Sequence, residues 1–160
     1  MLETLLSSFS LVAVSEIGDK TQLLAFSLAA RFRRPWPILA GILVATIANH
    51  ALAAGAGAWV ASHVEPRTLS IGVGLLFIGF GIWTLKPDSL DEDKKTKDFG
   101  PFATSAVLFF LAEMGDKTQF ATMTLAARFQ SPVWVTLGTT IGMMVTDWVA
   151  VLLCDRIAHR

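Results

Sequence analysis

Long apolar blocks separated by short polar turns divide the chain into five segments, each long enough to cross a bilayer as a helix. None of these blocks carries the regular polar stripe that marks an amphipathic helix of a soluble domain. The pattern therefore predicts an all-α integral membrane protein. The expected transmembrane helices cover residues 4–30, 38–62, 68–85, 101–127 and 133–153.

One charged heptapeptide lies inside the first apolar block and returns inside the fourth. Residues 16–22 read EIGDKTQ and residues 113–119 read EMGDKTQ, an offset of 97 positions. The similarity extends further, since 13 of the 26 aligned positions between residues 16–41 and 113–138 are identical. Identity at this level over a fixed offset indicates an internal duplication.

The duplication predicts two repeats. Residues 1–85 form the expected first repeat, residues 86–100 a charged linker, and residues 101–160 the second repeat. Three helices per repeat is an odd number, so the second copy would cross the membrane in the opposite direction, as in many secondary transporters. The counterpart of the third helix would begin near position 165, beyond Arg160. We therefore expect two inverted-topology three-helix repeats, the second truncated to two helices and without a sixth helix.

The distribution of basic residues predicts the orientation. Outside the two motifs, nine Lys and Arg residues fall on one side of the expected membrane and two on the other. Because the basic side of a membrane protein faces the cytoplasm, we expect an external N-terminus and a cytoplasmic linker. The nine are Arg31, Arg33, Arg34, Lys86, Lys94, Lys95, Lys97, Arg156 and Arg160, against Arg67 and Arg128.

Composition narrows the classes of function. Hydrophobic residues make up 53% of the chain and charged residues only 16%, with a mean hydropathy of +0.57. The formal net charge is zero, so there is no electrostatic case for a nucleic-acid partner. Cys154 is the single cysteine, which excludes an internal disulfide and a cysteine metal cage.

The acidic residues of the two motifs are the candidate functional residues. In a continuous helix Glu16 and Asp19 share a face, and Glu113 and Asp116 repeat that geometry. Carboxylates inside a membrane are costly and usually functional. If the two helices converge, these hard oxygen ligands suit calcium, magnesium or manganese. Further oxygens come from Thr21, Gln22, Thr118 and Gln119.

The charges of the motifs suggest a mechanism. The ionised side chains of each motif carry a net charge of minus one, so two motifs that converge would balance one divalent cation. Without a cation, the carboxylates would take up protons, because burial disfavours their charged form. A site that alternates between metal and protons is what a cation/proton antiporter requires. The lysines, Lys20 and Lys117, have three interpretations: they pair with the glutamate one turn away, hold the empty site neutral, or extend toward the membrane surface.

Three polar residues in other apolar blocks are candidates for supporting roles. His50 and Asp147 occupy the same position in the two repeats. An intramembrane aspartate predicts a residue that orients the ligands or relays protons. Asn49 and His50 are explained equally well by hydrogen bonds between helices.

The doubled Glu-x-Gly-Asp-Lys-Thr motif resembles the signature of the uncharacterised-protein-family cation transporters, which include the yeast Golgi calcium/manganese transporter. The resemblance covers essentially the whole chain. It implies two inverted three-helix repeats and exchange of manganese or calcium for protons, without a resident cofactor. It also implies that Glu16, Asp19, Glu113 and Asp116 bind the transported ion. The missing sixth helix departs from the family pattern.

The resemblance also implies a cellular setting and partners. Short loops and the lack of an N-terminal extension resemble bacterial members, which export manganese across the inner membrane. The expected partners are divalent cations and membrane lipids, with a possible homodimer. Two alternatives from other classes stay open: a membrane-embedded lipid-pyrophosphate phosphatase, and a structural subunit completed by a partner chain. Every arginine lies at a predicted helix end or loop, which disfavours the phosphatase because its chemistry needs an arginine at the phosphate.

Overall fold

The structure, a computed structural model, describes residues 1–85 and 99–158. Within these residues it contains seven α-helices and no strand, which confirms the predicted all-α class. The helices are α1 (Leu2–Ser15), α2 (Lys20–Phe32), α3 (Pro35–His63), α4 (Pro66–Thr84), α5 (Pro101–Glu113), α6 (Lys117–Phe129) and α7 (Pro132–Ala158).

Three of the described helices are long and apolar enough to cross a membrane. Their qualifying segments are Pro35–His63 in α3, Pro66–Trp83 in α4 and Pro132–Cys154 in α7. They correspond to the helices expected over residues 38–62, 68–85 and 133–153. Most of the predicted linker, residues 86–98, lies outside the described residues, as do residues 159–160.

The expectation of continuous helices over residues 4–30 and 101–127 is wrong. The first is broken between α1 and α2, and the second between α5 and α6, both times at the charged motif. Gly18 and Gly115 have φ angles of 79° and 78°, in the left-handed region that glycine adopts without steric cost. A residue in this conformation cannot continue a right-handed helix. The motif residues are therefore displayed by two turns rather than along one helical face.

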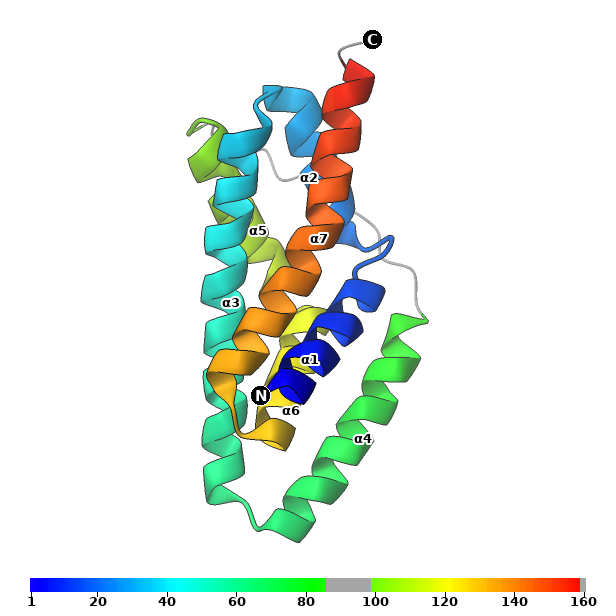
Figure 1. Cartoon of the computed structure of the whole chain (residues 1–160), viewed down its shortest axis with the longest axis vertical. Coiled ribbons are helices and arrows are strands. Elements are labelled where there is room, and N and C mark those ends of the chain that lie inside the picture. The colour runs from blue at the N-terminus through cyan, green and yellow to red at the C-terminus, as the bar shows by residue number, and fades with distance from the viewer. Residues whose placement is uncertain (86–98, 159–160) are drawn as a thin grey trace.

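The two halves of the described chain run in opposite directions. In Figure 1, α3 descends while α7 ascends beside it, and α1 followed by α2 runs opposite to α5 followed by α6. Helix α3 packs against α5 and α7 packs against α1. Helix α4 lies at the periphery against α6, where the rings of Trp83 and Phe120 pack at a tilt with their centroids 5.6 Å apart.

Close approaches of backbone occur at equivalent glycines of the two halves. A Cβ atom on Gly41 of α3 would lie 2.5 Å from the carbonyl oxygen of Phe102 in α5. A Cβ atom on Gly138 of α7 would lie 2.6 Å from the carbonyl oxygen of Leu5 in α1. Gly41 is equivalent to Gly138, and Leu5 is equivalent to Phe102, by the 97-residue offset. Reciprocal contacts of this kind are what a twofold relation between two halves produces.

The interior is polar where the motifs lie and apolar on either side. Apolar packing between α2, α3, α5 and α7 centres on Ala25, Ile42, Phe109 and Val151, all of them buried. Large apolar side chains also cover the outside of the helices, including Leu52 and Leu75. An apolar exterior around buried carboxylates is the arrangement expected of a protein in lipid.

Candidate cation site

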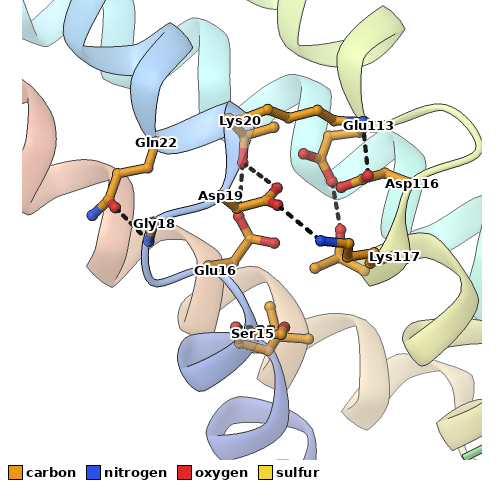
Figure 2. A network of polar contacts seen from close by, with 12 residues as sticks. Ser15, Glu16, Gly18, Asp19, Lys20, Gln22, Glu113, Asp116 and Lys117 are labelled. Atoms are coloured by element: carbon orange, nitrogen blue, oxygen red, sulfur yellow. Dashed lines mark hydrogen bonds and ion pairs between the residues drawn. The ribbon is translucent and has the colours of Figure 1, made fainter. Parts of the chain in front are cut away.

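The two helix breaks face each other in the interior of the bundle. Figure 2 shows the acidic side chains of both motifs and the two lysines gathered between them. Asp19 and Asp116 occupy the N-cap positions of α2 and α6, where the positive end of the helix dipole favours negative charge. The negative C-terminal ends of α1 and α5 also point into this region. Discontinuous helices of this kind build the ion sites of many transporters.

Three carboxylates from the two motifs form one compact group. Glu16, Asp19 and Asp116 each offer an oxygen atom, and these atoms lie within 4.8 Å of one another. All three side chains are buried, with relative exposures of 0%, 4% and 3%. Oxygen ligands lie about 2.0 to 2.6 Å from a bound magnesium or calcium ion, so one ion can contact three oxygens with this spacing. The group draws ligands from both halves of the chain.

Glu113, the fourth predicted ligand, lies beside this group rather than in it. Its side chain is fully buried and accepts a hydrogen bond of 2.8 Å from the hydroxyl of Thr118. Glu16 accepts an equivalent bond of 2.8 Å from Thr21. In each glutamate the other oxygen, Oε1, has no hydrogen-bond partner among the described residues. Both glutamates therefore keep one oxygen available to an ion or a proton.

The glutamines of the motifs brace the turns. The Oε1 atom of Gln22 accepts a 2.9 Å hydrogen bond from the backbone N–H of Gly18. The Oε1 atom of Gln119 accepts a 2.6 Å bond from the N–H of Gly115. These amide oxygens, predicted as further cation ligands, instead satisfy the backbone where each helix is broken. The glycines were not predicted as site residues, although a glycine between two acids in both repeats was the available signal.

The two lysines connect the motifs crosswise. The Nζ atom of Lys20 lies 2.7 Å from Oδ1 of Asp116, and the Nζ atom of Lys117 lies 3.9 Å from Oδ1 of Asp19. Pairing within a motif had assumed a continuous helix, and the breaks remove that geometry. Each half therefore supplies a cation to the other half, which links the two turns across the interior.

Asp147 of α7 lies near the carboxylate group. It is fully buried, and neither of its oxygens has a hydrogen-bond partner among the described residues. When ionised, its carboxylate would repel those of Glu16, Asp19 and Glu113, so Asp147 is a fifth acidic side chain in the electrostatics of the site. Sequence reasoning had identified this aspartate by its place in the membrane and by its repeat equivalence to His50.

Its repeat counterpart, His50 of α3, is also fully buried without a hydrogen-bond partner among the described residues. The neighbouring Asn49 donates a 3.0 Å hydrogen bond to the carbonyl oxygen of Phe110 in the last turn of α5. The same carbonyl oxygen also accepts the backbone N–H of Met114, so Asn49 adds a second hydrogen bond near the end of the broken helix. Asn49 thus supports the second motif from a neighbouring helix.

Comparison with known proteins places this chain in a family. Residues 4–92 and 101–160 match the family described as divalent cation/proton antiporter GDT1. A protein of Vibrio cholerae serotype O1, provisionally named a manganese exporter, is 45% identical over 154 residues, which are 96% of this chain and 77% of that protein.

Other similar proteins come from plants and cyanobacteria. The GDT1-like protein 3 of Arabidopsis thaliana is 30% identical over 192 residues, spanning all of this chain and 65% of the relative. A GDT1-like protein of Synechocystis is 29% identical over 183 residues, spanning all of this chain and 87% of the relative. No solved structure matches the chain significantly.

Proposed function

Because this chain belongs to the GDT1 family of divalent cation/proton antiporters, we propose that it exchanges manganese for protons across a bacterial inner membrane. The family transports cations and is not a family of enzymes, so the phosphatase alternative is set aside. The proposed direction is manganese export, as the name of the Vibrio cholerae relative suggests for that protein.

The observation that carries the proposal is the carboxylate group drawn from both helix breaks. Glu16, Asp19 and Asp116 bring three oxygens within 4.8 Å of one another in the interior. Four acidic residues and two lysines in the paired motifs sum to a charge of minus two when all are ionised. One divalent cation would balance this charge, and balance matters most where water is excluded.

Proton coupling is supported by the two glutamates of the motifs. Glu16 and Glu113 each keep one oxygen without a hydrogen-bond partner among the described residues. Such an oxygen can hold a metal ion or a proton, but not both at once. Exchange then requires only that the site opens to one side with metal bound and to the other with protons bound.

Two arguments favour manganese over calcium. Calcium takes six to eight oxygen ligands, and the described site gathers three carboxylates. A smaller ion with fewer protein ligands suits this group better, and manganese accepts carboxylate oxygens readily. The relative from Vibrio cholerae, with 45% identity, carries a manganese name. Calcium is the second candidate cargo.

The proposed topology follows the sequence prediction, with the N-terminus outside and the charged linker in the cytoplasm. The opposite directions of α3 and α7 support two inverted repeats. In this arrangement the two helix breaks sit near the middle of the membrane, and the transported ion would pass between them.

The test is proton-coupled flux in proteoliposomes that contain a pH-sensitive dye. External manganese should change the internal pH in vesicles that contain the protein, and the change should be absent with an Asp19→Asn, Asp116→Asn double variant. Glu65→Gln, which changes an exposed residue between α3 and α4, is the matched control and should behave as the wild type. Manganese flux without any pH change would reject proton exchange, and flux that survives the double variant would reject the site.

A further inference from the structure

Both aspartates of the carboxylate group are already engaged by lysines of the opposite motif. The ammonium group of Lys20 contacts Oδ1 of Asp116 at 2.7 Å, and that of Lys117 lies 3.9 Å from Oδ1 of Asp19. Two of the three acidic residues that would bind a metal ion therefore already hold internal cations. Any divalent ion that uses this group has to compete with them.

The competition is strongest at Asp116. Its second oxygen, Oδ2, is buried and has no hydrogen-bond partner among the described residues, so it is open to a metal ion. An ammonium group on Oδ1 would then lie only a carboxylate's width from a divalent charge. Repulsion between like charges at this separation is large where water is excluded. The ion pair of Lys20 and the bound metal therefore oppose each other.

The two lysines differ in their freedom to move. The side chain of Lys20 is 28% exposed, whereas that of Lys117 is 6% exposed. A partly exposed lysine can swing its ammonium group outward on its flexible stem. A buried lysine would lose its acidic neighbours without gaining water, which is costly. Lys20 is thus the cation that can leave, and Lys117 is the one that stays.

We propose that Lys20 is a tethered competitor of the transported cation: its ammonium group holds Asp116 when no metal is bound and is displaced when a divalent cation binds, while Lys117 remains beside Asp19. The inference rests on the proposed function and specifies how the site releases its ion. Return of Lys20 to Oδ1 of Asp116 would place a positive charge beside the metal on Oδ2 and so promote release of the metal. Lys20 is therefore a residue that tunes affinity rather than a ligand.

The first experiment follows the reactivity of the amine in the wild-type protein. The protein in lipid nanodiscs is treated briefly with a small water-soluble acetylating reagent, with and without saturating manganese, and each lysine is quantified by mass spectrometry. Acetylation of Lys20 should rise several-fold on manganese binding. Lys117, its counterpart in the second motif, is the matched control and should not change. In Asp116→Asn, Lys20 should react readily with or without manganese.

The second experiment measures manganese affinity by titration calorimetry on the wild type, Lys20→Gln and Lys20→Arg. Removal of the competitor should tighten binding by roughly tenfold or more, because one opposing charge has left a site shielded from water. Lys20→Gln should also slow turnover in proteoliposomes, whereas Lys20→Arg keeps the charge and should bind manganese no more tightly than the wild type.

The outcomes separate this inference from the proposed function. If the wild type binds manganese while Lys20 stays equally protected from acetylation, the tethered competitor is rejected and the transport function stands. Unchanged affinity in a folded Lys20→Gln would reject it as well. If the wild type binds no divalent cation, the proposed function itself fails.

Discussion

Thr46 and Met143 occupy equivalent positions in the two repeats and contact each other, with the Oγ1 atom of Thr46 3.4 Å from the Sδ atom of Met143. Residues related by a twofold axis can touch each other only close to that axis. The contact therefore locates the axis at the crossing of α3 and α7. The ion pairs of the two motifs are reciprocal across the same axis, since Lys20 reaches Asp116 and Lys117 reaches Asp19.

The aspartates of the carboxylate group should be individually required for cation binding. Asp19→Asn or Asp116→Asn removes a negative ligand and leaves the opposing lysine without its charged partner. We expect manganese affinity to fall by at least roughly 100-fold in each variant. This loss exceeds the 10- to 100-fold loss of affinity that is typical when a residue outside the ligand shell is replaced. Titration calorimetry in detergent measures this. Glu65→Gln is the control, and equal affinity in either aspartate variant and the control would contradict the assignment.

The left-handed turns of the motifs should be sensitive to any side chain. Gly18→Ala and Gly115→Ala place a Cβ atom on a backbone with φ near 79°, which costs about 1–2 kcal/mol of folding free energy. Thermal unfolding in detergent should show the loss in both variants, along with weakened manganese binding because the turns carry the ligands. Gly72→Ala on the helix α4 meets nothing within 4 Å and is the control, expected to unfold at or slightly above the wild-type temperature. Equal unfolding temperatures and equal manganese affinities in all three variants would contradict the left-handed turns at Gly18 and Gly115.

The twofold packing predicts equal costs at two distant positions. An alanine at Gly41 or Gly138 would bring its Cβ atom to 2.5 or 2.6 Å from a carbonyl oxygen of the neighbouring helix. The helices must move apart, and overpacking of this kind costs about 1–3 kcal/mol. Stability measured by chemical denaturation should fall by similar amounts in both variants. A large loss of stability at one glycine and none at the other would be inconsistent with reciprocal packing. Gly74→Ala is the control, because a Cβ atom at this position meets nothing within 4 Å.

Asp147 should strengthen cation binding through its negative charge without contacting the cation directly. Because its charge interacts with Glu16, Asp19 and Glu113, Asp147→Asn should weaken manganese binding by about tenfold. The same substitution should depress proton-coupled flux more than binding if the residue carries protons. His50→Gln, its counterpart in the other repeat, should leave binding nearly unchanged. Calorimetry and dye-based flux on the same preparations test both statements, and a greater loss in His50→Gln than in Asp147→Asn would reverse the assignment.

Much of this architecture could be predicted from the sequence, because the strongest signals in the sequence are local. Long apolar blocks specify helices in lipid by their length alone, and the repeated heptapeptide identifies the charged turns directly. The offset of 97 even pairs Thr46 with Met143 and Gly41 with Gly138, although only the structure reveals that these pairs lie at interfaces.

The breaks and the crosswise ion pairs could not be read in the same way. Glycine is common in transmembrane helices, so Gly18 did not by itself signal a turn. The carboxylate that each lysine contacts depends on how the two halves of the chain pack together. The sequence pattern holds no information on this packing. For the same reason the four predicted ligands could not be divided into the three that gather and Glu113, which lies beside them.

The most direct test of the account is the position of a bound manganese ion. Crystals or a lipid-phase preparation of the protein soaked with manganese, measured at the manganese absorption edge, would show the ion as an anomalous peak. The account predicts a single strong peak between Glu16, Asp19 and Asp116, with ligand distances near 2.2 Å, as expected between those of magnesium and calcium, roughly 2.0 to 2.6 Å. A peak elsewhere in the chain, or none at this group under conditions where manganese binds, would contradict it.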